Sequence, residues 1–299
     1  MRERFTAATA EALDRDPRVV VVLADIGAAL FERTGAPARH PGRIVNVGIR
    51  EQLLIGATAG FALEGYRPIA HSYAPFLVER PFEQLKLDLG HQGVGAVLVS
   101  IGASYDAAEE GRTHQAPEDV SLLASLPGWT IEVPGHPDEV ERALRRAVAA
   151  PGCVYIRLSE EINARAFCDE GLTLVRKGSD PGPLVVAVGP TLDATLAAVS
   201  DLDVSVAYLS TVRPFDRAGV RRALRGTDVV IVEPTLAGTS AAEISATLAD
   251  RPNRLLALGV RNPELRRYGS GPEHRQAQGL DAQGIRTSVE GFLALRTAA

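Results

Sequence analysis

The sequence predicts an α/β protein with two domains, each a mostly parallel sheet flanked by helices. Short apolar runs rich in β-branched residues alternate with segments of helical periodicity, which is typical of parallel sheets with helices on both faces. The chain has 299 residues, 45% of them hydrophobic, which is enough for two domains of about 100–200 residues each. A polar stretch that ends G-S-D-P-G-P interrupts the alternation. We therefore expect a first domain at 1–165, a linker at 166–183 and a smaller second domain at 184–299.

Each expected element follows from a local pattern. Runs rich in Val, Ile and Leu predict the strands of the first domain, at 18–23, 43–47, 68–71, 95–101, 130–134 and 153–157. Apolar residues at helical spacing predict the helices between them, at 50–64, 76–90, 117–126 and 137–150. The second domain repeats the alternation, with a helix near 191–200 and strands at 184–188, 204–208, 228–232 and 254–258.

Charge and cysteine content exclude several classes of protein. A net charge of -5 at pH 7 argues against nucleic-acid binding, which requires clustered positive charge. Cys153 and Cys168 are too few for a disulfide framework or a metal cluster, and their scarcity fits a reducing cytoplasm. Asp25 interrupts the most apolar stretch, which is also too short to cross a bilayer. We therefore expect a cytoplasmic protein that binds neither nucleic acid nor a membrane.

Motifs of the common nucleotide and hydrolase sites are missing from the sequence. No G-x-G-x-x-G follows a strand with an acid at dinucleotide spacing, and neither a G-x-x-x-x-G-K-[ST] loop nor a G-x-S-x-G elbow occurs. The 6 histidines are scattered, without the spacing of metal ligands. Candidate residues must therefore be sought beyond the carboxyl ends of the strands, where open parallel sheets bind their ligands.

Glu51 is the first candidate. It opens the helix expected at 50–64, directly after the strand expected at 43–47. An acid in a first helical turn usually serves only the helix dipole, and position alone favours that interpretation. Its apolar neighbours would also help it to hold a proton by desolvation. Glu51 could then share or donate that proton to a bound heterocycle.

Two further candidates follow the next strands. Tyr73 and Phe76 come after the strand at 68–71 and could stack on a flat ring, although core packing explains them as well. The connection from Gly102 to Gln115 is long for an α/β loop and carries His114 just before a predicted helix. A helix N-terminus favours a neutral imidazole that can donate a hydrogen bond to a substrate oxygen. A surface histidine near two acids is the alternative.

Taken together, these segments resemble the C-terminal half of transketolase. The pyrimidine-domain signature of that family is similar to V-G-I-R-E-Q-L-L-I-G-A-T-A-G-F-A-L-E-G in this chain. Its G-E-D-G-x-[TS]-H-Q-P segment is similar to E-E-G-R-T-H-Q-A-P-E-D-V-S-L-L-A-S-L-P. In the second domain T-V-R-P-F-D resembles the family's T-I-K-P-L-D, whereas V-E-P-T-L-A-G departs from its common V-E-E-H.

The resemblance implies a thiamine diphosphate enzyme that transfers a two-carbon ketol unit from a ketose to an aldehyde or ketone. Glu51 matches the glutamate that hydrogen-bonds N1′ of the aminopyrimidine, so that the exocyclic amine can remove the thiazolium C2 proton. Tyr73 and Phe76 match the aromatic pair that packs against the pyrimidine ring, and Arg80 lies on the same segment.

On the substrate side, the resemblance implies three contacts and two departures. His114 matches an imidazole that contacts substrate oxygens, and Glu110 falls where the family has an aspartate facing substrate hydroxyls. Gly102 stands where the family often has a histidine. Glu160 replaces the phosphate-binding arginine of its I-R-x-S-R motif, while Arg157 of that motif remains as a substrate contact, with a structural role as the alternative. Because an acid repels phosphate, we expect an unphosphorylated donor or an unusual acceptor.

A partner subunit is also implied by the resemblance. Transketolase holds Mg²⁺ and the diphosphate through a G-D-G…N motif in a preceding domain, and no G-D-G occurs in this chain. No metal ligands are therefore assigned here. We expect a separate N-terminal transketolase-like subunit to supply that site, with thiamine diphosphate held between the chains. Two copies of each would form a symmetric heterotetramer in which this chain also dimerises.

Three alternatives remain at this point. The β-subunit of a 2-oxo acid dehydrogenase E1 component also divides the cofactor site between chains and has a strand similar to G-Y-R-P-I here. Deoxyxylulose phosphate synthase is normally a single longer chain, so the length counts against it. A non-catalytic scaffold partner is the third alternative. The presence of Glu51, both aromatic residues and His114 counts against it, whereas the departures at Gly102 and Glu160 leave it open.

Overall fold

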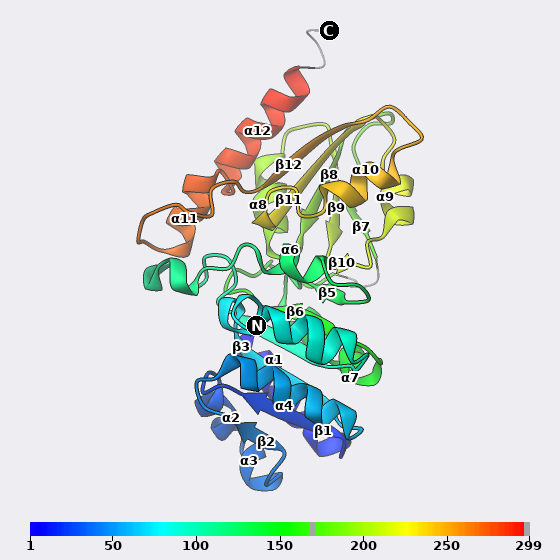
Figure 1. Ribbon diagram of the computed structural model, residues 1–299. Coiled ribbons are helices and arrows are strands. Elements are labelled where there is room, and N and C mark those ends of the chain that lie inside the picture. The colour runs from blue at the N-terminus through cyan, green and yellow to red at the C-terminus, as the bar shows by residue number, and fades with distance from the viewer. Residues whose placement is uncertain (168–170, 296–299) are drawn as a thin grey trace.

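In the computed structural model, which describes residues 1–167 and 171–295, the chain forms two sheets stacked along its length. Figure 1 shows the N-terminal sheet with its helices at the bottom and the C-terminal sheet with its helices at the top, with α6, β5 and β10 between them. Both sheets are mostly parallel and carry helices on both faces, so the predicted fold class is confirmed.

The first sheet has seven strands in the order β10-β5-β6-β4-β3-β1-β2. All neighbouring strands are parallel except β10, which pairs antiparallel with β5. Four of the strands are fully buried or nearly so, as their continuous apolar runs predict. The strands are β1 (Val19–Leu23), β2 (Ile44–Asn46), β3 (Arg67–Tyr73), β4 (Val97–Ile101), β5 (Thr130–Glu132), β6 (Val154–Arg157) and β10 (Thr211–Arg213).

The second sheet has five strands in the order β12-β11-β8-β9-β7. It is parallel except for β7, which runs antiparallel to β9 at the edge. The strands are β7 (Thr173–Arg176), β8 (Leu184–Val188), β9 (Ser205–Leu209), β11 (Asp228–Leu236) and β12 (Arg254–Val260).

Helices cover both faces of each sheet because alternate strand residues belong to different apolar clusters. In the first sheet one face packs against α1, α2 and α7, and the other against α4 and α6. In the second sheet α8 and α12 pack on one face. The described helices are α1 (Arg2–Arg15), α2 (Ala28–Thr34), α3 (Ala36–Arg39), α4 (Glu51–Leu63), α5 (Phe82–Gln84), α6 (Asp119–Ala124), α7 (Pro137–Ala149), α8 (Leu192–Ala198), α9 (Arg217–Ala223), α10 (Ala241–Thr247), α11 (Gly271–Gln278) and α12 (Ala282–Ala294).

All ten strands expected from the sequence are present, and β7 and β10 were not expected. β7 lies within the range predicted as a linker, and β10 leaves the second half of the chain to join the first sheet. Both are short strands at sheet edges, so neither has the buried apolar run that identifies a central strand. The domain boundaries at 165 and 184 stay a prediction.

The prediction of one continuous helix at 76–90 was only partly right. The segment consists of two π-helical stretches, Pro75–Glu79 and Leu85–His91, with the short α5 between them. Pro81 accounts for the interruption, because it lacks the N–H that a continuous helix requires. π-Helical turns occur frequently at functional sites. Among the described residues no helix combines the length and the apolar character needed to span a membrane.

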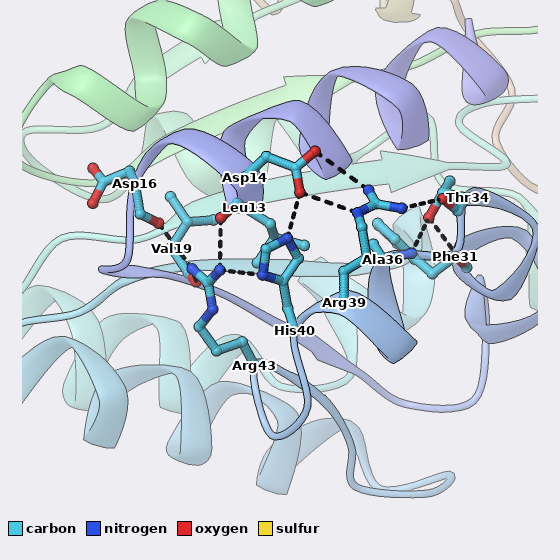
Figure 2. A network of polar contacts seen from close by, with 10 residues as sticks. All are labelled: Leu13, Asp14, Asp16, Val19, Phe31, Thr34, Ala36, Arg39, His40 and Arg43. Atoms are coloured by element: carbon cyan, nitrogen blue, oxygen red, sulfur yellow. Dashed lines mark hydrogen bonds and ion pairs between the residues drawn. The ribbon is translucent and has the colours of Figure 1, made fainter.

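A polar network holds residues 31–43 against α1 (Figure 2). Arg43 donates hydrogen bonds to the carbonyls of Leu13 and Asp16 at 2.6 and 2.9 Å. His40 links this guanidinium to the Asp14 carboxylate, with 2.5 Å from its Nδ1 to Arg43 Nη2 and 2.5 Å from its Nε2 to Asp14 Oδ1. Since Arg43 can only donate, Nδ1 accepts and Nε2–H donates to Asp14. The hydrogen bonds that Asp14 accepts, first from His40 and second from Arg39, lower the pKa of its carboxyl group. The network fixes the chain that leads into β2 and so to Glu51.

Candidate functional site

Glu51 lies at the first turn of α4, beyond the carboxyl end of β2. Its side chain is buried, with 4% of its surface exposed, as the sequence predicts. The surroundings are not purely apolar, however, because Arg80 Nη1 donates to Glu51 Oε1 at 2.7 Å. Arg80 is in turn held by Gln52, whose Nε2 donates to the Arg80 carbonyl at 3.2 Å. Gln52 was not among the predicted residues, although it directly follows Glu51 in the quoted signature.

Four of the predicted site residues form one contiguous group with Glu51. The Tyr73 and Phe76 rings meet edge to face, with centroids 6.0 Å apart. The His114 ring lies against both, at 5.5 Å from Tyr73 and 5.0 Å from Phe76. The Arg80 guanidinium stacks over Phe76 at 4.0 Å from the ring centroid. We call Glu51, Tyr73, Phe76, Arg80 and His114 the Glu51 cluster.

Three separate segments contribute to the Glu51 cluster. Tyr73 ends β3, and Phe76 belongs to the π-helical stretch that follows it. Arg80 caps the end of that stretch, where its N–H donates to the Pro75 carbonyl at 3.0 Å. His114 ends the second of two 3₁₀ turns in the long connection after β4. α6 begins only at Asp119, so His114 is oriented by the aromatic rings and not by a helix N-terminus.

The absence of a side chain at Gly102 is explained by the position of the Tyr73 ring. The φ of Gly102 is +64°, a left-handed conformation that favours glycine. A Cβ atom at this position would lie 2.0 Å from Cδ1 of Tyr73. The Tyr73 ring therefore occupies the space that a side chain at position 102 would need. A histidine could not be accommodated here without moving that ring.

A cavity of about 160 Å³ lies beside Tyr73 and Gly102. Its wall is rich in acids and includes Glu110 and Glu160, both predicted from the sequence to lie near substrate. It also includes Asp106, Glu109 and one guanidinium, that of Arg2. Burial raises the pKa of the Asp106 carboxyl to about 7, and Ser159 Oγ donates to it at 3.2 Å. Asp106 was missed in the sequence because no local pattern marks it within the connection.

Arg157 lies apart from the Glu51 cluster. The guanidinium is 1% exposed and donates to Asp119 Oδ2 at 2.8 Å and to Ser104 Oγ at 2.5 Å. Tyr155 donates to the same Asp119 oxygen at 2.7 Å. These contacts give Arg157 a structural role in joining β6 to α6. The predicted contact between Arg157 and substrate stays a prediction.

The Glu51 cluster fits the aminopyrimidine half of thiamine diphosphate. A buried acid can hold a ring nitrogen, and the rings of Tyr73 and Phe76 supply flat apolar surface for a heterocycle. A metal site would instead require several His, Cys, Asp or Glu side chains close together. Within residues 1–167 and 171–295, no group of three or more His, Cys, Asp or Glu side chains could hold a metal ion.

Comparison with known proteins gives relatives along the whole chain. An uncharacterized 33.6 kDa protein in the fasciation locus of Rhodococcoides fascians is 47% identical over 97% of this chain and 93% of its own length. A 6-deoxy-6-sulfo-D-fructose transketolase subunit of Clostridium sp. (strain MSTE9) is 28% identical, covering 88% of this chain and 85% of its own. A 1-deoxy-D-xylulose-5-phosphate synthase of Thioalkalivibrio sulfidiphilus is 31% identical over 94% of this chain, which spans only 45% of that protein.

A solved structure has a similar fold along the whole chain. A structure described as a split gene transketolase, inactive beta4 tetramer, superimposes with a TM-score of 0.82 and 25% identity over 98% of both chains. Residues 1–164, which carry the whole Glu51 cluster, match the family described as the transketolase pyrimidine binding domain. The resemblance found in the sequence is thus confirmed, and the chain belongs to the transketolase pyrimidine-binding-domain family.

Proposed function

We propose that this chain is one subunit of a split, thiamine diphosphate-dependent transketolase that moves a two-carbon ketol unit from a ketose to an aldehyde or ketone. The observation that carries the proposal is the assembly of the Glu51 cluster from three separate segments. Family membership and the transketolase subunits among its relatives support the same reaction class.

The residues of this chain have separate roles in the proposal. Bound thiamine diphosphate would supply the electron sink for cleavage of the carbon–carbon bond. Glu51 would hold a proton at the pyrimidine N1′, and Arg80 orients Glu51 through their 2.7 Å contact. Tyr73 and Phe76 would pack against the pyrimidine ring and exclude water from it.

His114 and Glu110 form the substrate side of the proposed site. His114 presents its imidazole to substrate oxygens from beside Tyr73 and Phe76. Thr113 Oγ lies 3.0 Å from His114 Nδ1, which leaves Nε2 for the substrate. Glu110 faces substrate hydroxyls from the wall of the 160 Å³ cavity.

A second subunit would complete the site. Four exposed apolar side chains lie on or beside the helix that carries Glu51, or on the π-helical stretch packed against it. We call these the apolar rim: Ile49 (72% exposed), Leu53 (49%), Leu63 (60%) and Leu87 (41%). Ile49 and Leu53 lie at the same end of α4 as Glu51, where exposed apolar side chains are available to an interaction partner. We infer that the rim docks the transketolase-like subunit that binds the diphosphate and Mg²⁺, in a heterotetramer with two copies of each chain. A cytoplasmic location remains part of this proposal.

Reconstitution tests the proposed function. The purified chain with thiamine diphosphate and Mg²⁺ is expected to show no ketol transfer, whereas adding a transketolase-like subunit that carries the diphosphate-binding G-D-G…N motif should produce transfer from a ketose. Leu53→Asp should weaken assembly at least about tenfold, because an unpaired carboxylate would be buried at the interface. The measurement is sedimentation of the mixed subunits together with transfer activity.

A matched control is Leu295→Asp, which changes an equally apolar side chain, 66% exposed, at the end of α12. It should leave assembly unchanged. Turnover of a ketose by the isolated chain would contradict the proposal. A requirement for pyruvate in place of a ketose would instead favour a deoxyxylulose phosphate synthase-like or E1-like reaction.

The acidic cavity supports an unphosphorylated substrate. Glu110 and Glu160 line it together with two further acids, so a phosphate dianion would meet like charge there. We expect the assembled enzyme to have a higher kcat/KM for unphosphorylated xylulose than for xylulose 5-phosphate. Glu160→Arg should raise kcat/KM for the phosphate by about tenfold, since it exchanges repulsion for a guanidinium contact. A strong preference of the unaltered enzyme for the phosphate would refute this expectation.

A further inference from the structure

We propose that the second half of the chain positions the substrate-side residues, because segment 261–278 clasps the connection that carries Glu110 and His114. We call this connection, residues 102–115, the His114 loop. The inference rests on the proposed function for its catalytic meaning, but the clasp itself is a property of the folded chain. It makes Gln278 and Arg112 positioning residues for the proposed reaction.

The first contact of the clasp is the burial of Tyr105. Its side chain is 3% exposed and, with Ala108, belongs to the apolar cluster around the second sheet and not to that of the first. The Tyr105 ring lies 4.7 Å from that of His274 on α11. The His114 loop is therefore inserted into the core of the other half of the molecule.

Gln278 makes the second contact. Its Nε2 donates to Tyr105 OH at 2.9 Å and to the Asn262 carbonyl at 2.8 Å. Its Oε1 accepts from the backbone N–H groups of Arg261 and Asn262 at 3.1 and 3.2 Å. One amide side chain at the end of α11 thus joins the turn after β12 to the His114 loop.

Arg112, two residues before His114, makes the third contact. Its Nε donates to Glu264 Oε1 at 3.0 Å, so that an ion pair spans the two halves. Its other nitrogens donate to Glu118 at 2.5 Å and to the Gln115 carbonyl at 2.7 Å. The guanidinium therefore sets the curvature of the loop around His114 as well as its attachment.

Tyr268 completes the clasp. Gly111 has φ +76°, and a Cβ there would lie 3.0 Å from Cε1 of Tyr268. This ring covers the backbone of the loop at Gly111 although 77% of its surface is exposed. Segment 261–278 therefore anchors the loop near its substrate-facing side chains, whereas Ser104 and Asp106 attach its beginning to other segments.

Hydrogen exchange of the full chain tests the clasp without reference to activity. Gln278→Ala is expected to speed amide exchange in the peptide spanning 102–116 by about 3–10-fold, the effect of losing neutral hydrogen bonds. Tyr105→Phe removes only the hydroxyl and should also speed exchange in this peptide. Exchange in the double variant should be only slightly faster than in Gln278→Ala, because both changes remove the same hydrogen bond. The control is Gln276→Ala, an exposed residue on the same helix, which should change nothing.

Activity of the assembled complex provides the second measurement. Gln278→Ala should lower kcat with little change in thiamine diphosphate affinity, because the Glu51–Arg80 and Tyr73–Phe76 contacts do not involve the His114 loop. Exchange in 102–116 that matches the unaltered chain would overturn the clasp. If exchange rises but even the unaltered complex transfers no ketol unit, the clasp stands and the proposed function fails.

Discussion

Glu51→Gln is expected to lower ketol transfer by about 10²–10⁴-fold in an otherwise intact complex, the usual contribution of a positioned proton donor or acceptor. Glutamine keeps the size of the side chain and can still accept from Arg80, whose Nη1 lies 2.7 Å from Glu51 Oε1. It cannot hold an acidic proton against the pyrimidine N1′. The expected result is therefore a loss of turnover with assembly unchanged, measured by transfer kinetics and sedimentation of the same preparation.

The control for this substitution lies at the far end of the same helix. Glu64 follows the last turn of α4 and is exposed, so Glu64→Gln changes the charge equally without touching the cluster. The free energy of unfolding should change by only about 0–1 kcal/mol in Glu51→Gln. The Arg80 side chain is 44% exposed, so its guanidinium stays hydrated when the ion pair is lost. Full activity of Glu51→Gln would contradict the catalytic role proposed for Glu51 and favour the scaffold alternative.

Gly102→Ala is expected to lower the free energy of unfolding by about 2–5 kcal/mol, since backbone strain and overpacking add at this position. The left-handed φ of +64° is costly for alanine, and its Cβ would come within 2.0 Å of Tyr73 Cδ1. The Tyr73 ring must then move, and it would carry its contacts with Phe76 and His114 with it. Denaturant unfolding of the isolated chain measures the effect.

Two variants separate strain from overlap at Gly102. Gly93 has φ +68°, and a Cβ atom there would meet nothing within 4 Å, so Gly93→Ala should cost only the strain, about 1 kcal/mol. Tyr73→Ala combined with Gly102→Ala should be less destabilised than the sum of the two single changes, because the smaller side chain removes the overlap. Equal losses for Gly102→Ala and Gly93→Ala would contradict the proposed overlap.

Local patterns were sufficient for most of the first sheet and for much of the site. The continuous apolar runs of β1, β3, β4 and β6 predict buried strands, because a strand covered on both faces is apolar along most of its length. Glu51, Tyr73, Phe76 and His114 were chosen as candidates because each follows a strand in a parallel sheet, where ligands bind, and the structure brings these four side chains together. The quoted family signatures then related these positions to one reaction class.

Contacts between distant segments could not be predicted in the same way. The Glu51–Arg80 pair, the overlap of Tyr73 with Gly102 and the burial of Arg157 against Asp119 each join residues from different elements. No local periodicity encodes such pairs, because their partners are chosen by how the elements pack.

By itself, the sequence determined the α/β class, the central strands and the residue types beyond their ends, since these follow from short-range burial and backbone preference. Only the tertiary structure decided that β10 crosses to the first sheet, and that Tyr105 draws the His114 loop into the second core. The physical reason is that an edge strand or a loop gains its stability from contacts made after the sheets have formed, and those contacts depend on geometry that no single segment contains.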